Sequence, residues 1–213
     1  GTVTGSKYLF EVDDGRVLVD CGLFQGFKQL RLRNWAPLPV DPKSIDAVVL
    51  THAHLDHSGY LPLLVKKGFS GPVICTEATR DLCGILLPDS GYLQEKDAEY
   101  ANRHGFSKHR PALPLYTLED AKVSLERFAP IAFQQEREIA DGLSVRFLAA
   151  GHILGAAIVE VKCGGLTVVF SGDLGRPGSA TMVDPAAVRS ADYLVVESTY
   201  GDRLHERLDA EEA

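Results

Sequence analysis

The chain has 213 residues, of which 45% are hydrophobic and 24% charged, with 20 Gly and 11 Pro. This composition is typical of a globular protein and excludes disorder, collagen and coiled coil. The net charge of −7 excludes binding of polyanions through a general positive surface, so any role with nucleic acid must depend on a local site.

The sequence carries no sign of a membrane span or an export signal. No apolar run approaches the ~18 residues of a membrane helix, and no charged start precedes an apolar stretch. The cysteines lack the C-x-x-C spacing and are expected to be reduced, structural thiols in a cytoplasmic protein: Cys21, Cys75, Cys83 and Cys163. Because the chain begins at Gly1 and enters a strand-like segment at once, we expect it to lack its natural first residues.

The first third of the chain predicts strands followed by helices. Apolar, β-branched runs predict strands over 8–12, 17–19, 47–50 and 73–75. The first two should form a hairpin across an Asp-Asp-Gly turn. Helices are predicted over 60–67, closed by Gly68, and over 77–87, ended by Pro88.

The rest of the chain contains a polar insertion, one helix and more strands. Residues 89–116 have weak periodicity and are basic through Arg103, His104, Lys108, His109 and Arg110. A capping-box spacing, Thr117 to Asp120, starts a helix that runs to Phe128 before Pro130. Further strands are predicted over 145–148, 158–161, 167–170 and 193–196. The strands 158–161 and 167–170 should form a hairpin across Gly164-Gly165. The alternation of elements predicts a mixed α/β sandwich.

The segment 46–59 carries the strongest chemical signal, because a buried strand runs directly into three histidines and an aspartate. His52 and His54 are two apart and can face one side, while Asp56 and His57 follow around the bend. A lone histidine is more often a surface residue or a satisfied core residue, but four such side chains in six positions make that interpretation implausible. The loop can offer two imidazoles to one metal and a carboxylate plus an imidazole to a second. Zinc suits these donors, with manganese or iron as alternatives.

Two later strand ends repeat this arrangement on a smaller scale. His152 follows Gly151 after one strand, and Asp173 stands in Ser171-Gly-Asp after another. Alone, each is a weak signal of a metal ligand, and the aspartate in such a segment is more often part of a turn. Together with the histidine segment they are predicted ligands, since a closed metal site needs donors from several parts of the chain.

Two further acids also end strands. Asp20 can accept a hydrogen bond from the free ring nitrogen of a metal-bound histidine, although a plain turn residue is nearly as good an interpretation. Glu197 precedes Ser-Thr-Tyr-Gly-Asp, and on the residues alone a functional role and an ordinary surface role are equally open.

Taken in order, Thr51-His-Ala-His-Leu-Asp-His57, Gly151-His152 and Ser171-Gly-Asp173 resemble the metallo-β-lactamase superfamily. The resemblance implies an αββα sandwich with two metals at the strand ends. The segments 1–6, 19–25, 58–62 and 197–202 are similar to the β-CASP branch, which contains RNA-processing nucleases such as ribonuclease J and the cleavage and polyadenylation endonuclease subunit. Stand-alone bacterial and archaeal members look most similar.

The resemblance also implies roles for the residues that match. It implies two zinc ions, with His52, His54 and His152 on the first, Asp56 and His57 on the second, and Asp173 bridging them. Asp20 matches the first acidic motif of the family, and Glu197 matches the acid that opens the β-CASP region. As catalytic residues, Asp56 and Asp173 would orient the attacking oxygen. Glu197 would tune a ligand or assist proton transfer to the leaving oxygen.

The resemblance further implies how the chain is divided. Residues 1–196 would be an incomplete metallo-β-lactamase domain and 197–213 the start of the β-CASP region. The family continues with a cap domain and then returns to the sandwich with another metal-binding histidine, whereas this sequence stops at Ala213. His205 is not at a matching motif and is not assigned to that role.

The sequence therefore predicts a zinc-dependent phosphodiesterase that cleaves RNA. We expect RNA as its partner and no membrane association, and a homodimer is a possible assembly. One alternative is another hydrolase of this fold that acts on a thioester or a small phosphodiester, because metal motifs are silent on substrate. The segment that begins with Glu197 discriminates against it. A second alternative is a non-catalytic relative that binds RNA or a partner, but its ligands would usually be eroded.

Overall fold

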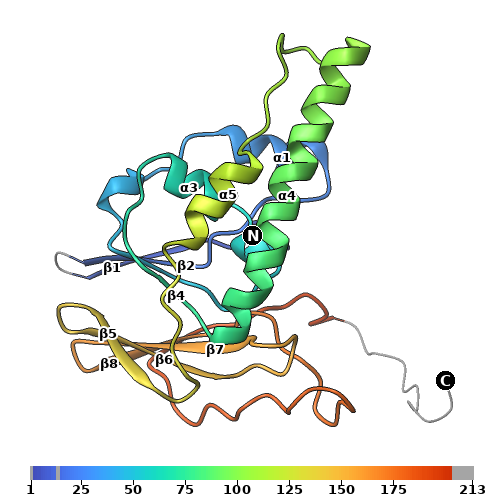
Figure 1. Ribbon diagram of the computed structural model, residues 1–213. Coiled ribbons are helices and arrows are strands. Elements are labelled where there is room, and N and C mark those ends of the chain that lie inside the picture. The colour runs from blue at the N-terminus through green and yellow to red at the C-terminus, as the bar shows by residue number, and fades with distance from the viewer. Residues whose placement is uncertain (1, 13–14, 203–213) are drawn as a thin grey trace, which may run out of the picture.

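The computed structural model describes residues 2–12 and 15–202 and consists of two stacked β-sheets with helices on one side (Figure 1). His205 and most of the segment 197–213, the expected start of the β-CASP region, lie outside the described residues. The first sheet has the order β1-β2-β3-β4. Its strands are β1 (Tyr8–Val12), β2 (Gly15–Val19), β3 (Ala47–Val49) and β4 (Val73–Ile74).

The second sheet has the order β5-β6-β7-β8-β9. Its strands are β5 (Glu136–Ala140), β6 (Leu143–Ala149), β7 (Ala157–Cys163), β8 (Leu166–Phe170) and β9 (Tyr193–Val195). Both predicted hairpins are confirmed, because β1 pairs antiparallel with β2 and β7 with β8. Among the strands of the described residues, β5 alone was not predicted. Its first three residues are charged and exposed, so it lacks the apolar run that identifies a strand.

The main core lies between the two sheets. Alternate side chains of β2 and β3, among them Val19 and Val49, point toward Val145 and Val159 on β6 and β7. A second core packs the other face of the first sheet against the helices. Because both faces of this sheet are buried, β3 is a continuous apolar run.

The helices lie over the outer face of the first sheet (Figure 1). They are α1 (Lys28–Leu32), α2 (Leu55–Ser58), α3 (Leu61–Lys66), α4 (Glu77–His104) and α5 (Leu118–Leu125), with short 3-10 turns η1 (Arg33–Trp35) and η2 (Pro42–Ser44). The predicted capping box is confirmed: Thr117 accepts from the Asp120 amide, and Asp120 accepts from the Thr117 amide. The helix ends at Leu125, three residues earlier than predicted.

The predicted end of a helix at Pro88 is wrong, because α4 continues through it to His104. Buried contacts beyond the proline hold the continuation in place. Ser90 is hydrogen-bonded to the Tyr116 hydroxyl at 2.8 Å, and Gly91 lies so close to Thr117 that a Cβ there would be 2.6 Å from its carbonyl oxygen. Packing against the start of α5 therefore offsets the hydrogen bond that proline removes.

The outer face of the second sheet has no helix in the part of the chain that the structure describes. Instead, an irregular segment crosses it, where the Ala186 amide donates to Ala149 and Val188 packs on Ile158 and Val169. Three layers of the expected αββα sandwich are thus present, as helices, first sheet and second sheet. No helix among the described residues is both long and apolar enough to cross a membrane.

Candidate metal centre

The predicted site residues gather at one edge of the sandwich because each follows the carboxyl end of a strand. Asp20 follows β2, the segment 51–57 follows β3, and His152 follows β6. Asp173 and Glu197 follow the neighbouring strands β8 and β9, which are parallel to each other. The sheet register therefore brings together side chains that are more than a hundred residues apart in the sequence.

Four side chains form a first cluster of possible metal ligands. His54 Nδ1 lies 3.0 Å from His52 Nε2 and 3.2 Å from His152 Nε2. Asp173 Oδ2 lies 3.6 Å from His52 Nε2 and 3.5 Å from His152 Nε2. All four donor atoms lie within 4.8 Å of one another. Basic nitrogens that face one another at this distance, beside a carboxylate, form a donor set that fits a divalent cation.

A second cluster lies on the other side of Asp173. His57 Nε2 is 3.2 Å from Asp173 Oδ1 and 3.9 Å from Asp56 Oδ2. One carboxylate oxygen of Asp173 thus belongs to the first cluster and the other to the second. The described residues place three donor groups at this second position, one fewer than at the first.

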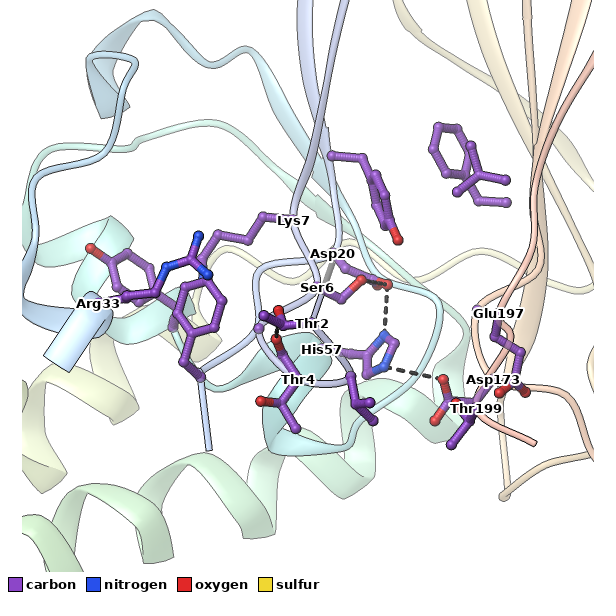
Figure 2. A pocket seen from close by; sticks show the side chains of 18 of the residues that line it. Thr2, Thr4, Ser6, Lys7, Asp20, Arg33, His57, Asp173, Glu197 and Thr199 are labelled. Carbon is purple, nitrogen blue, oxygen red and sulfur yellow. Dashed lines mark hydrogen bonds and ion pairs between the residues drawn. The ribbon is translucent and has the colours of Figure 1, made fainter. Parts of the chain in front are cut away.

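Asp20 holds the His57 ring from behind. Its Oδ2 lies 2.8 Å from His57 Nδ1, and its Oδ1 accepts from the Thr51 amide at 2.8 Å and the Thr51 hydroxyl at 2.9 Å. Figure 2 shows Asp20 and Asp173 on opposite sides of the ring. Because Asp20 is buried and accepts the proton of Nδ1, His57 presents Nε2 to the site.

The sequence did not predict a role for Thr51, although it belongs to the histidine motif. Its hydroxyl donates to Asp20 and lies 3.0 Å from His52 Nδ1. It therefore links a ring of the first cluster to the carboxylate that orients the second. Its position alone gave no signal, because a threonine that follows a strand is common.

The two clusters differ in charge. Burial, together with the neighbouring His57, lowers the pKa of His52 to about 2, and burial beside His152 also lowers the pKa of His54. Burial opposes a charge on His57 as well, but its hydrogen bonds to Asp173 and Asp20 raise its pKa to about 10. His52 and His54 are thus held as neutral imidazoles, the form that binds metals, whereas His57 holds a proton.

Two close backbone contacts fix the loops that carry these ligands. A Cβ at Gly22 would lie 1.5 Å from the Asp56 carbonyl oxygen, and one at Gly175 would lie 1.7 Å from that of Gly151. A side chain at position 22 would push apart the loops of Asp20 and Asp56, and one at position 175 would push apart the loops of Asp173 and His152.

The structure places Glu197 next to the loop of Asp173. Its Oε1 accepts from the Leu174 amide at 2.6 Å, and its own amide donates to Ser171 Oγ at 3.0 Å. The carboxylate therefore holds the backbone one residue after Asp173. Figure 2 shows its side chain beside that of Asp173.

A cavity of about 930 Å³ opens beside the second cluster. Asp20, His57, Asp173 and Glu197 line it together with the N-terminal segment, whose Ser6 hydroxyl donates to Asp20 at 3.2 Å. The next residue, Lys7, also lines the cavity; its ammonium lies over two aromatic rings and donates to the Gly22 carbonyl. The size is at the upper end of the range for small-molecule pockets.

The layered fold and the His/Asp cluster at its strand ends define a class, the metal-binding α/β sandwich proteins. The profile of the Metallo-beta-lactamase superfamily matches residues 1–210, and the chain belongs to this superfamily.

Curated relatives are similar over nearly all of this chain. Ribonuclease TTHA0252 of Thermus thermophilus is 39% identical over 203 residues, which are 95% of this chain and 42% of the relative. Transcription termination factor FttA of Methanocaldococcus jannaschii is 35% identical, over 94% of this chain and 31% of the relative. Cleavage and polyadenylation specificity factor 73 of Drosophila melanogaster is 30% identical, over 97% of this chain and 28% of the relative. The chain spans less than half the length of each.

Proposed function

We propose that this protein is a zinc-dependent ribonuclease of the β-CASP branch that hydrolyses phosphodiester bonds of RNA in the cytoplasm. The observation that carries the proposal is the position of Asp173, which presents one carboxylate oxygen to each of two adjacent donor clusters. This arrangement suits a pair of metal ions. The names of the relatives, a ribonuclease and a cleavage factor among them, support RNA as the substrate.

The ligand sets follow from the donor atoms. His52, His54 and His152 would hold the first zinc, Asp56 and His57 the second, and Asp173 both. Zinc ions bound at such a pair lower the pKa of water and offset charge on phosphoryl oxygens.

The protein's own groups position this chemistry. Asp20 fixes the His57 ring so that Nε2 faces Asp173, and Asp56 and Asp173 are the carboxylates that can orient an attacking oxygen. Glu197 holds the loop of Asp173 through the Leu174 amide. We assign Asp20 and Glu197 as positioning residues on these contacts, in place of a direct role for Glu197 in proton transfer.

A second candidate is hydrolysis of a thioester or a small phosphodiester at the same site. The cavity beside the second cluster is large enough for such a ligand, and the donor set does not select among these substrates. A purely binding relative is less well supported, because the metal-ligand residues that the sequence predicted within the described chain lie together in the fold.

The decisive experiment compares substrates on the full-length protein. It should cleave single-stranded RNA, and Asp173→Asn should abolish cleavage while leaving the thermal unfolding profile similar. The matched control is Asp141→Asn in an exposed turn, which should cleave like the parent. Thioester hydrolysis without RNA cleavage would replace this proposal with the second candidate.

A further inference from the structure

The far end of α4 and the segment after it form a projection that the metal centre does not use (Figure 1). We call residues 100–113 the tip. The tip contains three Lys or Arg, two His and no Asp or Glu, whereas the whole chain has 22 Lys or Arg and 29 Asp or Glu. The nearest acid along the helix, Glu99, is paired with Lys96 at 2.9 Å, and Asp97 lies one half-turn further back. Positive charge is thus concentrated on a part of an otherwise acidic protein.

Three rings stand together on the tip. The Tyr100 ring centroid lies 4.0 Å from that of His104 and 5.6 Å from that of Phe106. His104 Nδ1 donates to the Tyr100 carbonyl at 2.9 Å, which fixes the imidazole. Yet Tyr100 is 56% exposed and Phe106 65% exposed. The rings are therefore assembled and still open to solvent.

The backbone of the tip is held in one conformation. The Asn102 side chain donates to the Ala112 carbonyl at 3.0 Å and accepts from the Ala112 amide at 2.7 Å, tying the returning segment to the helix. The helix ends at His104, and the next residue, Gly105, turns the chain with a φ of +67°. A hollow of about 320 Å³ lies between the helix end and the returning segment, with His109 and Arg110 in its wall.

We propose that the tip binds single-stranded RNA, by stacking unpaired bases on Tyr100 and Phe106 and by pairing phosphates with Arg103, Lys108 and Arg110. Exposed rings combined with a positive surface are the usual means of holding single strands without sequence preference. The concentration of positive charge favours a polyanion over an apolar protein partner. The choice of RNA rests on the proposed function.

The placement of the tip implies a dependence on RNA length. α4 begins beside the metal centre, where Thr76 donates to the Gly155 carbonyl three residues after His152. Its 28 residues rise about 42 Å at 1.5 Å per residue. An RNA must therefore span about this distance to occupy the tip and the metal centre together, so only long RNAs gain affinity from both sites at once.

The test measures binding of fluorescent RNA to the full chain by anisotropy, with the intactness of the RNA checked on a gel. Tyr100→Ala and Phe106→Ala should each weaken binding of a long single strand by on the order of tenfold. Arg103→Gln with Lys108→Gln should lower the slope of log affinity against log salt by roughly 1.4. The matched controls are Phe27→Ala, an exposed ring elsewhere, and Lys28→Gln with Arg137→Gln; both should bind like the parent.

Two outcomes would overturn the proposal. One is unchanged affinity and salt slope in the tip variants when circular dichroism shows them folded. The other is equal binding of a double strand of the same sequence, because paired bases cannot stack on the rings. Binding is read separately from cleavage. Unchanged RNA binding in the tip variants of a protein that cleaves RNA refutes only this inference. Weakened binding in the tip variants of a protein that does not cleave RNA refutes only the proposed ribonuclease.

Discussion

The two donor clusters of the metal centre are built in different ways. The first is made by convergence, because His52, His54, His152 and Asp173 come from three segments and their donor atoms lie within 4.8 Å of one another. The second depends on a hydrogen bond from outside the cluster: buried Asp20 orients His57 for its contacts with Asp173 and Asp56. The first cluster should fail when one of its ligands is lost. The second should also fail when Asp20 is lost, because this residue orients the ligand His57.

The largest effect is expected when the first cluster is removed. His52→Ala with His54→Ala takes two of its four donors, so the protein should lose the tightly bound metal and all RNA cleavage. Elemental analysis of protein purified without chelator measures the metal, and thermal unfolding shows whether the variant folds. The control replaces two exposed histidines, His104→Ala with His109→Ala, and should keep the metal. Unchanged metal in the first variant would contradict the ligand assignment.

Zinc titration of the metal-free chain should separate the clusters. We expect one tight and one weaker event, because the second position has three donor groups among the described residues. The second event should also release a proton and strengthen as pH rises toward 10. The reason is that His57, with its pKa raised to about 10, is protonated at neutral pH and must become neutral to bind. Calorimetry in buffers of different ionisation enthalpy measures that proton. Two equally tight zinc-binding events without proton release would contradict the expected difference between the two clusters.

Asp20→Asn should weaken the second cluster alone. The amide keeps the size of the carboxylate but not its charge, so the His57 ring loses its anionic acceptor. We expect the weaker zinc event to lose about 10- to 100-fold in affinity and the tight event to stay unchanged. The same titration measures both. An equal loss at both clusters would show that Asp20 supports the whole loop, through Thr51, and not one ring.

Glu197→Gln should give the smallest effect. The side-chain oxygen can still accept from the Leu174 amide, and the variant loses only the charge-assisted part of that bond, about 1 kcal/mol. Cleavage should therefore fall less than about tenfold. A fall of about 100-fold or more in a folded variant would instead assign Glu197 to proton transfer.

The sequence indicated the ligands and one residue that supports them, Asp20, but not the rest of the supporting structure. His52 could be found because four possible ligands stand in six positions after a buried strand, and Asp173 because it follows another strand end in the same chain. Thr51 could not, since a threonine after a strand is ordinary until its hydroxyl is seen to join His52 to Asp20. Pro88 misled for a related reason. The local signal ends a helix, whereas the compensating contacts come from Tyr116 and Thr117, just before α5 and far from the proline in the sequence.

Asp20 also has a backbone conformation that L-residues other than glycine, asparagine and aspartate seldom adopt, with φ at +59°. The left-handed conformation disfavours a side chain there by about 1 kcal/mol. The carboxylate offsets this cost through its hydrogen bonds to the buried Thr51 amide and hydroxyl and to His57. Asp20→Gly would relieve the backbone but leave the Thr51 amide without its acceptor, which costs about 1 to 3 kcal/mol. The same carboxylate therefore serves the fold and the site, so durability cannot be gained at position 20 by giving up activity.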